Sequence, residues 1–171
     1  MQKSLQDFKM NYSSIKSYAK INLALNVTGK TSGLHQIESI VGFVSLHDVI
    51  LIKKIQSKKH VISFNGKYSK NIYKKNTISK LLKILEKKNL LAGHKFEIKV
   101  KKHIPSKSGL GGGSMNAANI LKYLIKKKFI KPSKRQLIHI CKSIGSDVAL
   151  GLNSTFTVLK SNNQIKEFKN C

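Results

Sequence analysis

The sequence predicts a single α+β domain, and three observations support this prediction. Alternation of apolar and polar residues with a period of two, which is typical of half-buried strands, dominates residues 19–64. Apolar residues at helical spacing recur between residues 78 and 144. Neither an internal repeat nor a low-complexity linker divides the chain, so one layered domain accounts for the pattern.

The first strands are expected to form a β meander. Residues 19–28 alternate between apolar and polar side chains, which predicts a strand buried on one face, with Lys20 and Asn22 side by side on the other. Residues 34–44 and 48–53 are predicted as two further strands joined by a turn.

Shorter strands are predicted farther along the chain. A strand at residues 60–64 is followed by Asn65-Gly66, which favours a hairpin with a weak return strand at 67–70. Residues 96–101 alternate clearly, and residues 155–159 are predicted as a last strand.

Three helices are expected between and after these strands. Thr77 can cap the first, which should end near Leu91. The second follows a glycine-rich segment, and the third should start at Pro132-Ser133 and stop at Gly145. We therefore expect a domain over residues 16–160, a loosely held arm at 1–15 and a tail at 161–171.

Size and composition limit the class of protein. The chain has 171 residues, 40% of them apolar, which excludes a disordered tail protein. No run of about 18 apolar residues and no secretory signal is visible, so the default prediction is a cytoplasmic protein without a membrane partner. Cys141 and Cys171 supply neither a metal quartet nor a disulfide framework.

The formal net charge of +26 raises the question of nucleic-acid binding. Arg135 is the only arginine, whereas phosphate forks and base contacts favour the guanidinium group. The lysines are spread along almost the whole chain, so a solvated basic surface explains the charge and a nucleic-acid partner is not favoured.

One glycine-rich segment carries the strongest functional signal. Residues 105–119 read PSKSGLGGGSMNAAN and lie between the predicted strand at 96–101 and a helical pattern. Glycine lets backbone N–H groups converge on an anion, and a helix N-terminus adds unpaired donors. The segment therefore predicts a phosphate site, although a flexible linker or a tight turn with Ser114 as the helix cap remains open.

Two well-known phosphate loops do not match this segment. The G-x-x-x-x-G-K-[ST] loop needs a lysine after its last glycine, but Gly113 is followed by Ser114 and Met115. The G-x-G-x-x-G fingerprint, counted from Gly109, has Ser114 at its last position. The phosphate site must belong to another class.

Three blocks together resemble the GHMP kinase superfamily. They are Ala19-Lys-Ile-Asn-Leu23, the segment from Ile104 to Ala118, and Gly145-Ser-Asp-Val148. The first block, with Gly33-Leu-His35 after it, points within that superfamily to the enzymes that phosphorylate a cytidine diphosphate sugar alcohol in non-mevalonate isoprenoid biosynthesis. The resemblance runs from about residue 17 to 159 and implies the family's N-terminal α+β domain, similar to domain 2 of ribosomal protein S5, with the C-terminal domain missing.

The resemblance also implies the site residues. Asp147 would accept the proton of the substrate hydroxyl and Lys20 would orient it, while ATP binds with Mg²⁺, with Ser114 near the metal. The segment expected to bind ATP consists of Pro105, Ser106, Lys107, Ser108, Gly109, Leu110, Gly111, Gly112, Gly113, Ser114 and Met115.

The resemblance assigns substrate binding to His35, which would lie beside the cytosine base, and to Asn22. Leu34 and Val41 stand where the family has aromatic residues, so part of the expected stack around the base is missing.

Two alternatives to an active kinase remain open. The first is an inactive truncated fragment, in which the motifs record ancestry. The second is a noncatalytic basic module with an S5-like fold that binds RNA. Oligomeric state is not predicted by the sequence.

Overall fold

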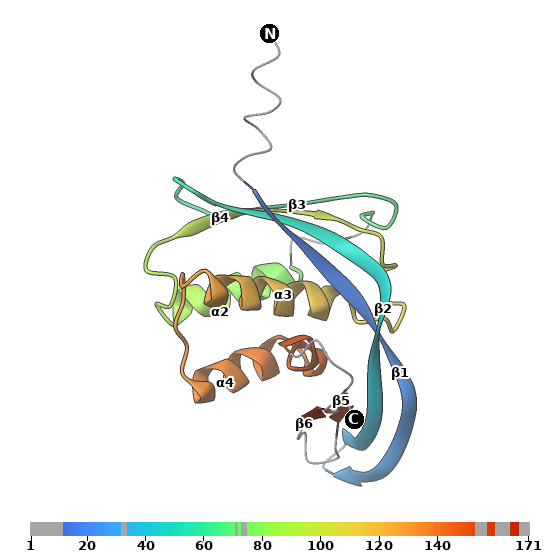
Figure 1. The fold of residues 1–171 in the computed structure, drawn as a ribbon. Helices are drawn as coiled ribbons and strands as arrows, with labels where there is room; N and C mark the ends of the chain where they lie inside the picture. Colours follow the sequence, from blue (N-terminus) through green and yellow to red (C-terminus); the bar gives the residue numbers. More distant parts are fainter. Residues whose placement is uncertain are drawn as a thin grey trace.

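The computed structural model describes residues 12–31, 34–70, 72, 75–152, 157–159 and 165–167. Its elements follow the predicted mixture of strands and helices (Figure 1). In chain order they are β1 (Ser13–Thr31), β2 (Leu34–Ile55), β3 (Val61–Asn65), α2 (Thr77–Lys87), β4 (Lys95–Lys101), α3 (Gly112–Lys126), α4 (Lys134–Ile144), the 3₁₀ turns η1 (Ser146–Val148) and η2 (Leu150–Leu152), β5 (Thr157–Leu159) and β6 (Ile165–Glu167).

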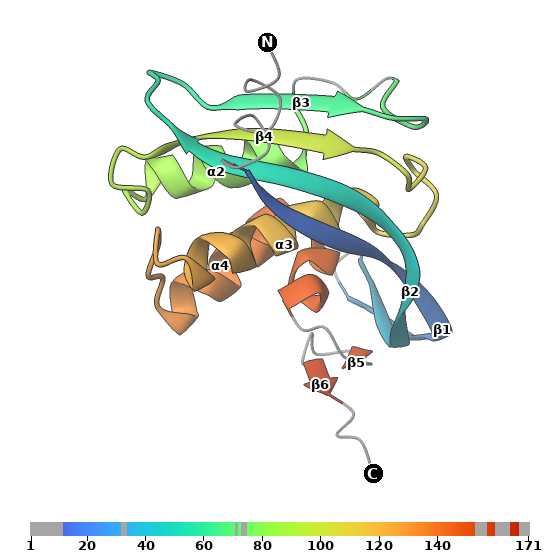
Figure 2. The ribbon, with the colours of Figure 1, turned by 45° about the horizontal axis from the view of Figure 1, so that its top comes forward.

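The elements form layers on one side of a mixed sheet. The strand order is β3-β4-β2-β5-β6, with β1 paired to β2. Figures 1 and 2 show α2 and α3 packed under the sheet, with α4 on the side of these helices that faces away from it. The other face of the sheet carries no helix among the described residues. This arrangement confirms the predicted α+β class.

The meander prediction is wrong beyond the first hairpin. β1 and β2 pair antiparallel, but β2 continues without a break through Leu46 and His47, where a turn was expected. β3 pairs parallel with β4, and residues 67–70 form no return strand. The reason is that α2 lies between β3 and β4 in the chain and supplies the long crossover that a parallel pair requires.

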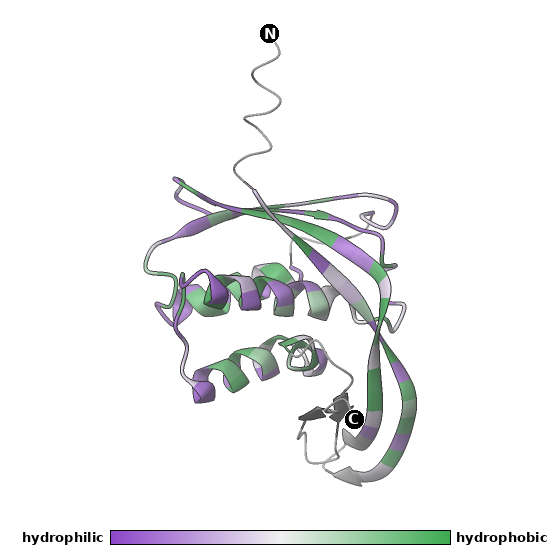
Figure 3. Ribbon diagram, viewed as in Figure 1, coloured by the Kyte–Doolittle hydropathy of each residue, from purple (hydrophilic) through white to green (hydrophobic). Residues whose placement is uncertain are grey.

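Apolar side chains from the sheet and the helices meet in one core. Phe96 and Ile98 of β4 are fully buried, as the alternation in residues 96–101 predicted. Figure 3 shows apolar residues along the facing sides of α2, α3 and the sheet. The largest fully buried side chains are Phe96, Ile50, Ile52, Ile78, Leu81, Leu85, Leu91, Ile98, Ile104, Met115, Ile120 and Leu121. This core fixes the β4–α3 connection that carries the glycine-rich segment.

The far part of the β1–β2 hairpin departs from the prediction. Residues 19–28 were expected to bury their apolar face, yet Leu23, Leu25 and Val27 are 56%, 50% and 60% exposed. The hairpin extends beyond the helices, so no helix covers this face among the described residues (Figure 1). Register shifts interrupt the pairing between Tyr18 and Ala19 and again farther along, and both Ala19 and Lys20 are buried. At this position the strand is therefore buried on both faces, and the glycine-rich segment lies against Lys20.

The helix ends agree with the predictions in α4 and differ in α2. Ser133 caps α4 and forms a capping box with Gln136, and Gly145 follows its last residue. The cap of α2 is Asn76 rather than Thr77, because the Asn76 carboxamide accepts from the N–H groups of Ile78 and Ser79. α2 also ends earlier than expected, at Lys87.

The ends of the domain differ from the expected bounds. β1 begins at Ser13, so part of the segment 1–15 belongs to the sheet. At the other end, β6 falls within the segment 161–171 that was expected as a tail. β5 covers Thr157–Leu159 of the last strand predicted at 155–159, and residue 155 lies outside the described residues.

Within the part of the chain that the structure describes, no helix is long and apolar enough to cross a membrane.

Cys141 lies in α4 among core side chains, and burial raises the pKa of its thiol to about 11. In a Cys171→Ser variant, we expect the remaining thiol to react with a disulfide reagent at pH 8 roughly 100-fold more slowly in the folded than in the unfolded chain. The folded thiol keeps its proton above the pH at which the unfolded thiol loses it, so the free energy of unfolding should fall as pH rises from about 9 to 11. Fast reaction in native buffer would contradict this burial.

Candidate active site

The glycine loop, residues 102–111, connects β4 to α3. Gly109 and Gly111 have φ angles of 77° and 68°, in the left-handed region that glycine adopts without strain. Gly111 is the N-cap of α3, so the helix begins inside the glycine run and not at Ser114. The first backbone N–H groups of α3 therefore point out of the helix end as anion donors.

The glycines of the loop allow close approach to neighbouring side chains. A Cβ on Gly111 would lie 2.7 Å from Cγ of Lys20, and one on Gly112 would lie 2.9 Å from Cγ2 of Ile104. The backbone N–H of Lys20 also donates to the carbonyl of Leu110 over 3.0 Å. The loop is thus held directly against β1. Gly111 and Gly112 are needed for their lack of a side chain as well as for their flexibility, because a Cβ at either position would collide with a neighbouring side chain.

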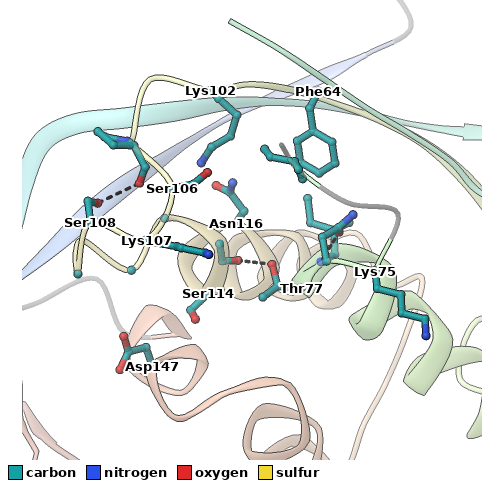
Figure 4. Close-up of a pocket in the computed structure, with 18 residues that line it drawn as sticks. Phe64, Lys75, Thr77, Lys102, Ser106, Lys107, Ser108, Ser114, Asn116 and Asp147 are labelled. Atoms are coloured by element: carbon teal, nitrogen blue, oxygen red, sulfur yellow. Dashed lines mark hydrogen bonds between the residues drawn. The ribbon is translucent and has the colours of Figure 1, made fainter. Parts of the chain in front are cut away.

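A cavity of about 590 Å³ lies in front of the loop and the α3 N-terminus (Figure 4). Its walls come from the end of β3, the start of α2, the glycine loop and η1. The lining residues are Phe64, Ile72, Lys75, Asn76, Thr77, Ile78, Lys102, Pro105, Ser106, Lys107, Ser108, Gly109, Gly111, Gly112, Gly113, Ser114, Asn116 and Asp147.

Most of the segment expected to bind ATP faces this cavity, but two of its members do not line it. Leu110 uses its carbonyl to hold β1, and the Met115 side chain is fully buried in the core. Helical geometry explains the Met115 difference, because a residue one position after Ser114 points to another side of α3.

Lys20 and Asp147 meet beside the glycine loop. The Lys20 ammonium lies 3.4 Å from Oδ2 of Asp147. Lys20 is 6% exposed, whereas Asp147 faces the cavity from η1, which follows Gly145 directly. The pair therefore places a carboxylate at the cavity with a buried ammonium fixed beside it.

Asn22 lies next to this pair. Lys20 donates to the Asn22 carboxamide oxygen over 3.3 Å, and the Ser39 hydroxyl donates to the same oxygen over 3.2 Å. The predicted side-by-side position of Lys20 and Asn22 is confirmed. Val41, which stands where the family has an aromatic residue, is buried on β2.

The structure does not place the predicted base contact. The backbone of His35 pairs with Lys30 in the β1–β2 hairpin, but the His35 side chain lies outside the part that is described, as does that of Leu34.

Sequence reasoning missed a buried polar cluster beneath the loop. Asp48 of β2 is fully buried and accepts from the N–H groups of His103 and Ile104 over 2.8 and 2.9 Å. Lys102 and the Asn116 carboxamide also donate to it. One signal was available, because an aspartate is out of place in the apolar run from 48 to 53.

Residues at the start of α2 also form part of the cavity wall. Asn76 and Thr77 line the cavity, and the Thr77 hydroxyl donates to the carbonyl of Gly113 over 2.7 Å.

We expect Thr77→Val to reduce the free energy of unfolding by about 1 kcal/mol, because the Gly113 carbonyl loses this donor without a change in side-chain volume. Thr77→Ser keeps the hydroxyl and should stay close to the wild type in chemical denaturation. Equal losses in both variants would mean that packing, not the hydrogen bond, holds the loop.

Comparison with known proteins identifies this arrangement. Residues 76–159 match the family described as the N-terminal domain of GHMP kinases. The chain is 60% identical over 161 residues to 4-diphosphocytidyl-2-C-methyl-D-erythritol kinase of Pelagibacter ubique, covering 94% of this chain and 57% of that protein. The chain contains a GHMP kinase N-terminal domain.

Two further relatives support the placement of this GHMP kinase domain. The kinase of the same name from Thermotoga maritima is 36% identical over 154 residues, which cover 88% of this chain and 53% of that protein. A crystal structure of 4-(cytidine 5'-diphospho)-2C-methyl-D-erythritol kinase superimposes with a TM-score of 0.71 at 25% identity, over 91% of this chain and 55% of that one. The chain thus spans about half the length of the relatives it matches.

The segment that matches the GHMP kinase family contributes most of the cavity. It includes α2, the glycine loop, α3 and Asp147. Lys20 and Asp48 come from β1 and β2, before the matched residues, and the sheet brings them to the loop.

Proposed function

We propose that this chain is the nucleotide-binding half of a kinase that transfers the γ-phosphoryl group of ATP to the 2-hydroxyl of 4-diphosphocytidyl-2-C-methyl-D-erythritol, in the cytoplasmic, non-mevalonate route to isoprenoids. The observation that carries the proposal is the Lys20–Asp147 pair, 3.4 Å apart at a cavity lined by the glycine loop and the α3 N-terminus. The 60% identity to a curated kinase of this name supports the choice of acceptor.

The donor site follows from the chemistry of the cavity walls. The N–H groups at the start of α3, with the positive end of the helix dipole, suit phosphate oxygens. Lys75 and Lys107 add positive charge, and Phe64, Ile72 and Ile78 form an apolar wall. A nucleoside triphosphate has this combination of a charged and a flat apolar part.

The transfer requires a base beside the γ-phosphate. Asp147 takes the proton of the acceptor hydroxyl while the oxygen of that hydroxyl forms a bond to the γ-phosphorus. The bond from the γ-phosphorus to the bridging oxygen breaks, and ADP is released. Lys20 keeps the Asp147 carboxylate oriented and offsets negative charge that develops on the transferred group.

One residue at the same end of the cavity suits a magnesium ion. The Ser114 hydroxyl lines the cavity, and a Cβ on Gly145, two residues before Asp147, would lie 3.7 Å from the Ser114 oxygen. A hydroxyl oxygen is a ligand that Mg²⁺ accepts beside phosphate oxygens. When bound with ATP, the ion would neutralise charge on the phosphates.

The proposal is tested in two stages on the 171-residue chain. Calorimetric titration should show Mg²⁺-dependent ATP binding, and phosphorus NMR should show ADP and a phosphomonoester when the cytidine diphosphate sugar alcohol is added. ATP binding without transfer would support the donor site and remove the catalytic claim for this chain alone. Salt-sensitive RNA binding without effect of ATP and without turnover would favour the noncatalytic RNA-binding alternative. A chain that neither folds nor binds ATP would favour the inactive fragment.

A further inference from the structure

Asp48 organises one wall of the cavity although it does not line it. Its carboxylate is fully buried, and both oxygens are used as acceptors. Oδ1 accepts from the backbone N–H groups of His103 and Ile104, at the entry to the glycine loop. Oδ2 accepts from Lys102 and from the Asn116 carboxamide of α3. One side chain thus joins β2, the loop and α3.

This contact fixes the orientation of the Asn116 carboxamide. An ionised carboxylate only accepts hydrogen bonds, so the amide nitrogen of Asn116 must face Asp48, and it does so over 2.9 Å. The carboxamide oxygen, Oδ1, then faces away from Asp48. It is buried without a hydrogen-bond partner among the described residues, in a side chain that is 2% exposed and lines the cavity. A buried acceptor without a donor is costly, which points to a donor on the ligand.

Lys102 presents the opposite polarity beside Asn116. Its ammonium pairs with Oδ2 of Asp48 and also lines the cavity, 3.3 Å from the position of a Cβ on Gly112. An ammonium group has three donors, and an acceptor on the ligand can use one of them. The wall therefore offers a donor and an acceptor side by side, both held by Asp48.

The direction of the nucleotide decides which part meets this wall. The γ-phosphate must lie near Lys20 and Asp147 for transfer. Figure 4 shows Lys102, Asn116 and Phe64 toward one end of the view and Asp147 toward the other. Asn116 Oδ1 would repel phosphate oxygens, whereas the aromatic ring of Phe64 suits a base. The adenine edge carries an amino donor next to a ring-nitrogen acceptor, which matches Asn116 and Lys102.

We propose that Asp48 is a positioning residue that sets base selection, because it turns the Asn116 carboxamide oxygen toward the 6-amino group of the bound purine nucleotide. The inference rests on the proposed function in one respect, that ATP is the ligand of the cavity.

Asp48→Asn tests the inference by exchanging one acceptor for a donor. The new carboxamide oxygen can keep both backbone contacts at the loop entry, while its nitrogen replaces Oδ2. The Lys102 ammonium loses its acceptor as well, so the variant is also expected to lose stability. Asn116 should then turn its oxygen to the new carboxamide nitrogen and its nitrogen to the cavity. A 6-oxo purine suits this arrangement, so we expect the wild-type chain to bind ATP at least about tenfold more tightly than inosine triphosphate, and the variant to lose or invert that preference.

The ratio of the two affinities, measured by calorimetry, separates positioning from structural damage. Destabilisation of the fold alone would lower the affinity for both nucleotides by the same factor. Glu97→Gln removes a carboxylate that pairs with lysines on the outside of the sheet, and it should leave the ratio unchanged. If Asp48→Asn does not fold, Asn116→Leu should abolish the preference for ATP while Asp48 keeps its contacts to Lys102 and the loop.

The outcomes distinguish this inference from the proposed function. A wild-type chain that binds ATP, with an unchanged ratio in Asp48→Asn or Asn116→Leu, would overturn the positioning role and leave the kinase proposal intact. A wild-type chain that binds ATP and inosine triphosphate equally would do the same. Absence of ATP binding by the wild-type chain would overturn both.

Discussion

Replacing Asp147 with asparagine is expected to lower the rate of phosphoryl transfer to the cytidine diphosphate sugar alcohol by about 10²- to 10⁴-fold. The amide has nearly the same shape but cannot take the proton of the hydroxyl, and the ion pair with Lys20 is lost. ATP affinity should be kept or rise, because a neutral group no longer repels the γ-phosphate. Turnover and ATP binding are measured separately, by phosphorus NMR and calorimetry.

Glu97→Gln is the matched control for this loss of a carboxylate. Glu97 pairs with Lys53 and Lys99 and does not line the cavity, so turnover should remain. Full turnover in Asp147→Asn would remove Asp147 as the base. A fall in ATP affinity equal to the fall in turnover would assign Asp147 to nucleotide binding instead of proton transfer.

The second large effect is expected from Gly111→Ala. The φ angle of 68° disfavours alanine by about 1–2 kcal/mol, and the new Cβ would lie 2.7 Å from Cγ of Lys20. Lys20 and the loop must then move apart, which displaces the ammonium from Asp147 and distorts the donors at the start of α3. We expect ATP binding to be lost and the free energy of unfolding to fall by about 3 kcal/mol in total.

Two other glycines separate strain from collision in this experiment. Gly93 and Gly109 also have left-handed φ angles, 78° and 77°, but a Cβ on either would meet nothing within 4 Å. Alanine at Gly93, outside the site, should cost only the backbone strain and keep ATP affinity. Alanine at Gly109 should cause the same backbone strain as alanine at Gly93, but within the glycine loop. If all three variants lose stability equally and bind ATP alike, the contact between Gly111 and Lys20 has no role in the site.

The parts of the fold that depend on neighbouring residues could be predicted from the sequence. The strand at 96–101 and the capped start of α4 at Ser133 appeared close to their expected positions. The glycine segment was placed correctly between a strand and a helix. These features arise from periodicity, capping and glycine conformation, which act over a few residues.

Pairing between distant strands could not be predicted in the same way. Asn65-Gly66 favoured a hairpin, but β3 joins β4 in parallel because α2 crosses between them. Residues 19–28 have a strand pattern whose apolar face was expected to be covered, and the structure leaves Leu23, Leu25 and Val27 exposed. Local patterns report which residues alternate, not which element packs against them.

The sequence by itself determined where a phosphate site is expected, because four glycines next to a helix start leave backbone N–H groups as the dominant local chemistry. Only the tertiary structure decided what surrounds that loop. The fold brings Lys20 of β1 against the loop and within 3.4 Å of Asp147, and Asp48 reaches from β2 to Lys102 and Asn116. These contacts join residues far apart in the chain, and they form because the shared core fixes β1, β2 and α3 together.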